Sequence, residues 1–357
     1  MVKIAKNIYL CSVKEKVGKS LLSIGIFSKL QKEGKKVAYF KPIGVPKAAF
    51  SAKADRDVGF ILNTIFKTKL PYDIISPVSI PDNYYIDLIN ATKKNEYLET
   101  IKHAYNELTK NFDYIVIEGA PSIKRFIRVG LDDVSIAEKL GIKELVFVET
   151  ESSDKCIDDL FFSNKYFEFR NIKTKGVIFN RIDYDYIARI RELEDNHIKR
   201  YDIPILGIIE LNYELLSLRA SEIQSGIGGE LINESATSGL SNDVLTIVIG
   251  AMNTQAALKY LRQAKKAAVI TGGDRTDLAL AALNEKISCL ILTGFMQPDV
   301  SVITMANEKG IPIILSPSDT YTTLKNIDRI KPGIQEDEIQ IALELVEKNI
   351  DWNLLLK

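Results

Sequence analysis

The strongest constraint on this chain is the stretch IYLCSVKEKVGKSLLSIGIFSKL, which runs from Ile8 to Leu30. It begins as a short apolar strand, passes through Val17-Gly18-Lys19-Ser20, and continues with apolar residues at helical spacing. A strand, a glycine-lysine-serine loop and a helix in this order are typical of a phosphate-binding loop, or P-loop. Most such loops have a glycine five residues before Gly18, where this chain has Val13.

The physical basis of this prediction is local. Backbone N–H groups of the loop and of the first helical turn present positive partial charge to a phosphate, and we expect Val17 and Gly18 to supply them. Lys19 would bridge the β- and γ-phosphates of ATP, and the Ser20 hydroxyl would ligate Mg²⁺, which prefers oxygen ligands. The alternative is an ordinary helix that happens to start with this tripeptide, but the strand–loop–helix context favours a nucleotide site.

Short apolar runs alternate with helical patterns along the chain. The expected strands of the first part are residues 8–11, 36–40, 114–117, 144–148, 176–179 and 203–209. Such runs suit parallel strands buried on both faces, so we expect an α/β fold with a parallel sheet and right-handed crossovers. A Gly- and Ser-rich stretch then predicts a linker at 226–240 between a domain at 1–225 and a smaller α/β domain at 241–357, which a polar helix at 336–349 closes.

Composition excludes several classes of protein. The formal net charge is +0, from 47 basic and 47 acidic residues, so no overall field draws the chain to nucleic acid or to an anionic membrane. We find neither an apolar run of about 18 residues nor the pattern of a signal peptide. The three cysteines are odd in number and widely spaced, which indicates buried, reduced thiols. We therefore expect a cytoplasmic protein with no nucleic-acid or membrane partner.

Charged residues at predicted strand ends extend the site. Glu118 ends one strand, where P-loop enzymes place a carboxylate on the metal side; otherwise it is a charge in solvent. Lys41 ends another, and strand carboxyl ends face the ligand crevice; otherwise it is a solvated lysine before a turn. Asp55 and Asp57 either reach the metal or cap a helix.

A family resemblance brings these motifs together. The segments YLCSVKEKVGKS, AYFKPIG, DRDVGFI, ISPV, YIVIEGA and GVIFNRI, in this order, resemble the dethiobiotin synthetase-like domain that lies N-terminal in long phosphotransacetylases. This similarity covers about residues 3–225. The remainder, with ITGGDRTDLALAALN, LILTGFMQPD and SPSDTYTT, resembles the DRTGG domain. The phosphate acetyltransferase catalytic domain has no counterpart in the chain, so we do not expect a complete phosphotransacetylase.

The resemblance implies a role for each matching residue. Lys19 and Ser20 would bind ATP phosphates and Mg²⁺, and Lys41 would contact phosphate and the carbamate-forming substrate, which makes both lysines catalytic candidates. Glu118 would hold Mg²⁺. A second metal carboxylate would be Asp57 or Asp55; both alternatives stay open, and Asp57 is carried forward as the candidate. Asn180 would touch adenine.

Two segments depart from the synthetase pattern. Ser12-Val13-Lys14-Glu15 replaces Gly-Thr-Asp-Thr, and Pro121-Ser122-Ile123-Lys124 replaces a glycine-rich substrate segment. These differences argue against the dethiobiotin reaction itself. Lys14 matches the signature lysine of the related partition and septum-site ATPases, which reaches the nucleotide of a dimer partner. Its alternative is an exposed loop lysine.

Two functional hypotheses follow from different classes. The first is a Mg²⁺·ATP-dependent enzyme that transfers a phosphoryl group to a small carboxylate or carbamate. The second is a regulatory protein that senses a nucleotide or an acyl phosphate through the P-loop and DRTGG domains without turnover. The resemblance implies a homodimer in both cases. The TGGDRTD segment, residues 271–277, either holds an anion at a helix N-terminus or is a turn with a cap.

Overall fold

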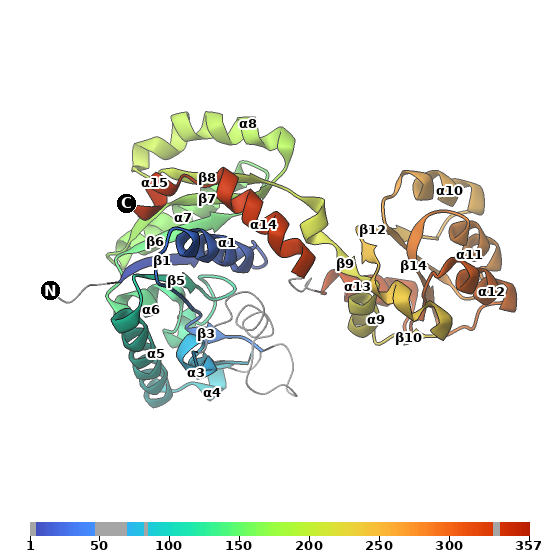
Figure 1. Ribbon diagram of the computed structural model, residues 1–357, viewed down its shortest axis with the longest axis horizontal. Coiled ribbons are helices and arrows are strands. Elements are labelled where there is room, and N and C mark those ends of the chain that lie inside the picture. Colours follow the sequence, from blue (N-terminus) through green and yellow to red (C-terminus); the bar gives the residue numbers. More distant parts are fainter. Residues whose placement is uncertain (1–4, 47–69, 82–84, 331–335) are drawn as a thin grey trace. The chain divides into compact units, whose positions relative to one another are not determined.

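The computed structural model describes residues 5–46, 70–81, 85–330 and 336–357. The chain forms two compact units (Figure 1). The first extends to Leu211 and also includes the last two helices of the chain, and the second begins at Asn212. Each unit has its own sheet and its own apolar core.

The first unit is built on a parallel sheet of six strands, in the order β2-β5-β1-β6-β7-β8. The strands are β1 (Lys6–Cys11), β2 (Val37–Phe40), β5 (Tyr114–Glu118), β6 (Glu144–Glu149), β7 (Lys173–Ile182) and β8 (Ile205–Glu210). Most of their residues are buried because helices cover both faces, which explains the nearly continuous apolar runs in the sequence. All six carboxyl ends meet at one edge of the sheet.

Helices cover the two faces of this sheet. One face packs against α1 (Lys19–Lys32), α3 (Tyr72–Ile75), α14 (Glu336–Asn349) and α15 (Trp352–Leu356). The other packs against α5 (Ala91–Asn111), α6 (Asp133–Leu140), α7 (Lys155–Phe169) and α8 (Tyr184–Leu193). On α5 the residues Ile101, Ala104, Tyr105 and Leu108 are buried, and their three- and four-residue spacing places them on one helix face.

Shorter elements complete the first unit. These are the paired strands β3 (Ile43–Gly44) and β4 (Val78–Ser79), the helix α4 (Tyr85–Leu88), and a 3₁₀ turn at Ile127–Val129. The helical segment that begins with α8 is not a continuous α-helix as far as Tyr201. After α8, a π turn at Glu194–Ile198 and a 3₁₀ turn at Lys199–Tyr201 replace its second half.

The second unit has a five-stranded sheet in the order β10-β15-β14-β13-β12, with only β10 antiparallel. Its strands are β10 (Glu230–Leu231), β12 (Thr246–Ile249), β13 (Ala267–Gly272), β14 (Ile287–Thr293) and β15 (Ile313–Leu315). The helices α10 (Thr254–Gln263), α11 (Thr276–Leu283) and α12 (Val300–Lys309) contribute to one core, and α9 (Ala220–Ile227) and α13 (Thr320–Asp328) to the other. A small ribbon pairs β9 (Leu218–Arg219) with β11 (Asp243–Val244).

The predicted linker at 226–240 is wrong, because these residues belong to the second unit. Strand β10 pairs with β15, and the next segment forms a 3₁₀ helix at Glu234–Ser241. The buried side chain of Asn233 donates to the carbonyl of Ile311 (2.9 Å) and accepts from the N–H of Ile313 (2.8 Å). The glycine and serine residues here lie at the end of α9, in the turn after it and in a 3₁₀ helix of the second unit. Their abundance therefore did not indicate a linker.

The assignment of the C-terminal helix to the second domain is also wrong, because α14 packs on α1 of the first unit (Figure 1). Val346 is buried against Gly25, where an added Cβ would lie 2.6 Å from the valine Cβ. Glu347 pairs with Lys29 (3.2 Å) and Lys32 (3.1 Å). The sequence predicts a polar helix here, but it does not show which distant surface the helix covers.

Candidate functional site

The loop between β1 and α1 turns at one edge of the first sheet. Gly18 has φ +85° and directly precedes the first residue of α1. This left-handed conformation favours glycine. Lys16 also has a positive φ, +59°, which is costly for a residue with a side chain. Val13, in place of the usual glycine, is buried in the core, so the altered loop remains packed.

Lys19 is buried at the start of α1, with 6% of its surface exposed. Its Nζ donates to Ser12 Oγ (2.6 Å) and to the carbonyl of Pro121 (3.0 Å). Burial lowers the pKa of Lys19, and the carboxylates of Asp133 and Glu118 oppose this shift. A buried ammonium whose hydrogen bonds go to neutral oxygens is well placed to exchange them for an anion.

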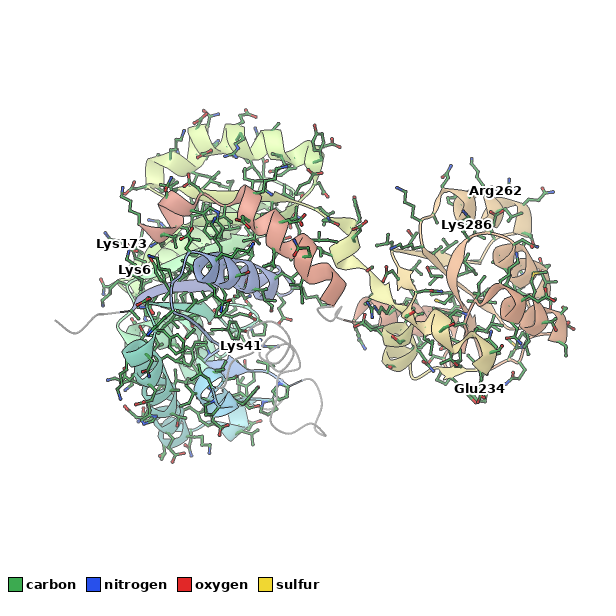
Figure 2. All side chains as sticks on the ribbon, viewed as in Figure 1. Lys6, Lys41, Lys173, Glu234, Arg262 and Lys286 are labelled. Atoms are coloured by element: carbon green, nitrogen blue, oxygen red, sulfur yellow. The ribbon has the colours of Figure 1, made fainter. Side chains whose placement is uncertain are left out.

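The carboxylate of Glu118, at the end of β5, contacts three side-chain donors. Its register partner on β1 is Leu10, which places its carboxylate beside the loop. Oε1 accepts from Ser20 Oγ (3.0 Å) and lies 3.1 Å from Lys41 Nζ, while Oε2 accepts from Tyr39 OH (2.9 Å). Glu118 is 4% exposed and Lys41, labelled in Figure 2, is 6% exposed. The alternatives that placed both charges in solvent are therefore wrong.

The donor set around Ser20 fits a magnesium ion chemically. A hydroxyl and a carboxylate, 3.0 Å apart, are both oxygen ligands of the kind that Mg²⁺ takes. Over the described residues, no group of three or more His, Cys, Asp or Glu side chains could hold a metal alone. Mg²⁺ usually keeps several waters and shares phosphate oxygens, so two protein ligands are sufficient. Asp57 and Asp55 lie outside the described residues.

Asn180 and Arg181 at the end of β7 contact the outer side of the loop. Asn180 Nδ2 donates to the carbonyl of Val17 (2.7 Å), and Arg181 Nη1 donates to the carbonyl of Lys16 (2.7 Å). The structure thus places Asn180 beside the loop, and its contact with adenine stays a prediction. The sequence did not predict the hydrogen bond from Arg181 to the Lys16 carbonyl. The feature that could have indicated it is the position of Arg181 next to Asn180 at the end of a predicted strand.

Lys14 is neither free nor fully exposed, since its side chain is 34% exposed. Its Nζ lies 2.7 Å from Glu151, 3.0 Å from Asp159 and 3.4 Å from Glu149. Partial burial opposes protonation, but the hydrogen bonds to Glu151 and Asp159 raise the pKa of Lys14 overall. Asp159 lies on α7, a helix that the sequence analysis did not identify, so this cluster was missed.

Asp133 is a buried carboxylate that the sequence analysis also missed. Its Oδ1 accepts from the N–H of Ala120 (2.8 Å) and from Tyr9 OH (3.1 Å), while its buried Oδ2 has no hydrogen-bond partner. Burial raises the pKa of Asp133 to about 7. Its hydrogen bond with the N–H of Ala120 fixes the backbone that follows Glu118. The available signal was an Asp-Asp pair immediately before a helix.

The described residues of the TGGDRTD segment in the second unit form the end of β13, a turn and the start of a helix. At the start of α11, Arg275 Nε donates to Asp277 Oδ1 (3.2 Å), and Asp277 also accepts from Thr254 (2.6 Å). Arg275 occupies the N-cap position, without a hydrogen bond from its side chain to the helix N-terminus. A hollow of about 770 Å³ elsewhere in this unit is lined by Glu230 and Glu234, the latter labelled in Figure 2, and by no basic residue.

The fold and this site define a P-loop nucleotide-binding class of protein, and the family comparisons agree. Residues 6–217 match the AAA domain family and residues 222–330 match the DRTGG domain family. The first match covers more than half of the chain, which therefore belongs to the AAA domain family and carries a DRTGG domain after it. The expected order of a P-loop domain followed by a DRTGG domain is confirmed.

Curated relatives with similar sequences are phosphate acetyltransferases. The protein from Synechocystis sp. is 24% identical over 368 residues, a match that covers 98% of this chain and 51% of the relative. The protein from Nitratidesulfovibrio vulgaris is 26% identical over 376 residues, covering 97% and 51%. The chain spans about half the length of the curated relatives it matches.

Solved structures with some similarity include the MinD cell division protein of Aquifex aeolicus. It is 22% identical, with a TM-score of 0.36, and the match covers 59% of this chain and 85% of that one. The CBS and DRTGG domains of a Clostridium perfringens pyrophosphatase, complexed with diadenosine tetraphosphate, are 15% identical. Their TM-score is 0.29, with 44% of this chain and 81% of that one covered. TM-scores this low establish no likeness in function.

Two further findings concern the remaining expectations. All three cysteines are free and buried, as expected from their spacing. In the described part of the chain, no helix combines the length and the apolar character that crossing a membrane requires.

Proposed function

We propose that the first unit binds Mg²⁺·ATP, with the polyphosphate tail lying on the amides of Val17–Ser20. The observation that carries this proposal is the convergence of two buried lysines, Lys19 and Lys41, with Ser20 and Glu118 at the edge where the strands end. Buried charges are rare unless they are paired or serve a ligand. The two ammonium groups supply positive charge that suits a phosphate.

Each of these side chains has a separate task in the proposal. Lys19 leaves the oxygens of Ser12 and Pro121 for the β- and γ-phosphates. Lys41 moves from Glu118 toward the terminal phosphate. Ser20 and Glu118 would then hold Mg²⁺, which neutralises phosphate charge when it is bound.

The enzymatic form of the proposal is phosphoryl transfer to a small carboxylate or carbamate. Lys19 and Lys41 are then the catalytic residues, because they stabilise the negative charge that develops on the transferred group. Their burial supports this role, since a low dielectric strengthens such interactions. Asp57 remains a proposed metal ligand, and Asn180 a proposed nucleotide contact.

A second candidate, a regulatory protein without turnover, is favoured by the segment Pro121–Lys124. The resemblance places the acceptor there, yet in this chain the segment is bonded to the loop. Lys19 donates to the Pro121 carbonyl, and the N–H of Ile123 donates to the carbonyl of Ser12 (2.8 Å). A phosphate that displaces Lys19 would alter this segment, which could report a bound nucleotide or acyl phosphate. We propose a cytoplasmic homodimer in either case.

Calorimetry and a turnover assay with the whole chain separate these candidates. ATP binding is measured with and without Mg²⁺, and ADP formation is followed across a panel of small carboxylates. Turnover that depends on one acceptor and is lost in Lys41→Met supports the enzyme. Binding that is not followed by turnover with any acceptor supports the regulatory protein. Absence of ATP binding contradicts the enzyme, and absence of binding by both ATP and acetyl phosphate contradicts the regulatory protein as well.

A further inference from the structure

We propose that Asn180 and Arg181, on β7, are positioning residues that hold the phosphate-binding loop in the conformation that binds phosphate. The inference rests on the proposed function, because it concerns the same loop. Both residues lie at the end of β7, where its pairing with β8 is irregular between Asn180 and Ile182. Their side chains donate to two consecutive loop carbonyls, those of Val17 and Lys16, each at 2.7 Å.

The direction of these two hydrogen bonds determines where the loop amides point. No peptide bond in the described residues is cis, so the C=O and N–H groups of each peptide plane point in opposite directions. The carbonyl of Lys16 shares its plane with the N–H of Val17, and the carbonyl of Val17 with the N–H of Gly18. When β7 binds both carbonyls, both N–H groups point away from β7, which is the side on which the phosphate is proposed to bind.

The loop needs an external support because its own sequence does not favour this shape. Lys16 is held at φ +59°, a left-handed conformation that is unfavourable for a residue with a Cβ. The glycine that would ease the turn at position 13 is absent. Strained backbone persists only where surrounding contacts enforce it. The hydrogen bond from Arg181 to the carbonyl of Lys16 is such a contact.

Gly18 makes the close approach of this support possible. A Cβ added there would lie 2.5 Å from Asn180 Nδ2 and 3.4 Å from Arg181 Nε. Arg181 itself has φ +61°, so both sides of the contact carry backbone strain. Asn180 is 6% exposed, and its hydrogen bond to Val17 is buried.

This role differs measurably from a contact to the base. A side chain that only touches adenine affects the binding of ATP and has no effect on inorganic triphosphate. A side chain that aims the loop amides affects both ligands by the same factor, because both use the same amides. A side chain that acts only by its positive charge produces an effect that falls as salt screens it.

The test measures dissociation constants of Mg²⁺·ATP and Mg²⁺·triphosphate for the wild type and for Arg181→Ala, Arg181→Lys and Asn180→Ala. Arg191→Ala, on the exposed surface of α8, is the control. We expect Arg181→Ala to weaken both ligands equally, on the order of tenfold, as for one hydrogen bond from a charged donor. Arg181→Lys should recover part of the loss, and the loss should be the same at about 50 mM and 300 mM salt.

Each other outcome overturns the proposal. A loss confined to ATP assigns Arg181 to the nucleoside, and a loss that disappears at high salt assigns it to charge alone. Unchanged binding of both ligands in Arg181→Ala would show that Arg181 does not hold the loop, and it would leave the proposed function intact. A wild-type chain that binds neither ligand overturns the proposed function and this inference with it. Because Asn180 is buried, Arg181→Ala decides the question if Asn180→Ala fails to fold.

Discussion

Ser20 Oγ donates to Glu118 Oε1 over 3.0 Å, so that the first turn of α1 and the end of β5 meet at one hydrogen bond. This contact follows from the parallel sheet, in which Leu10 of β1 is the register partner of Glu118. It places a hydroxyl and a carboxylate beside the loop, where the proposed Mg²⁺ binds.

Glu118→Gln is the first test of this pair. The amide keeps the shape of the carboxylate but has no charge, so Mg²⁺·ATP affinity should fall on the order of tenfold, or about 1.4 kcal/mol. ATP affinity without Mg²⁺ should not fall. Calorimetry with and without the metal measures both values. Glu210→Gln, at the exposed end of β8, is the matched control, and an equal loss with and without Mg²⁺ would refute the metal role.

The stability of the first unit should depend on the pH through Asp133. Burial raises the pKa of this carboxyl from 3.8 to about 7, with Lys19, Asp132 and Tyr9 as its other neighbours. Between these values the unfolded chain has lost the proton that the folded chain retains. The free energy of unfolding should therefore decrease from about pH 4 to pH 7 by on the order of 4 kcal/mol at most.

Asp133→Asn should remove this decrease, because the amide still accepts from Ala120 and Tyr9 but does not titrate. Denaturant unfolding of both chains at several pH values measures the difference. Parallel pH profiles for the wild type and the variant would contradict the assignment.

Gly25→Ala should loosen the C-terminal helix from α1. The new Cβ would lie 2.6 Å from the Val346 Cβ, and such overpacking typically costs about 1–3 kcal/mol. Thermal unfolding and proteolysis near α14 measure the loss. The double variant Gly25→Ala/Val346→Gly removes the valine side chain that the new methyl would meet, and it should be more stable than the sum of its two single changes predicts. Strict additivity would show that the two positions do not touch in solution.

Lys14→Ala addresses the proposal that this lysine reaches the nucleotide of a second copy. In the wild type, ATP hydrolysis per molecule should increase with protein concentration, because the partner must supply the lysine. In Lys14→Ala this dependence should disappear. Lys165→Ala, an exposed lysine on α7, is the control. Equal hydrolysis by the wild type and Lys14→Ala at every concentration would end the idea and leave Lys14 as a counterion of Glu149, Glu151 and Asp159.

The sequence predicted the sheet and the main cluster well because both follow from local patterns. Apolar runs identified the six strands of the first sheet, and parallel strands bring their carboxyl ends to one edge. Lys19, Ser20, Lys41 and Glu118 could therefore be expected together before any coordinates were known.

The contacts that the sequence did not predict all join distant segments. Asp159 on helix α7 pairs with Lys14, and Arg181 on β7 donates to the carbonyl of Lys16. Helix α14, near the end of the sequence, packs on α1. Neither periodicity nor turn residues encode such partners. The linker predicted from the Gly- and Ser-rich stretch was wrong for a related reason. Strand β10 in this stretch forms by pairing with β15, more than 80 residues away.

The most direct measurement of the central claim is the calorimetric titration of the wild type and of Lys19→Ala with Mg²⁺·ATP. Within the described part of the chain, Lys19 donates to Ser12 and Pro121, so an alanine should leave the fold intact while removing the charge that faces the phosphates. The account predicts saturable binding to the wild type and a loss of at least tenfold in the variant, or about 1.4 kcal/mol. Equal affinities in two folded proteins, or no heat from either, would contradict it.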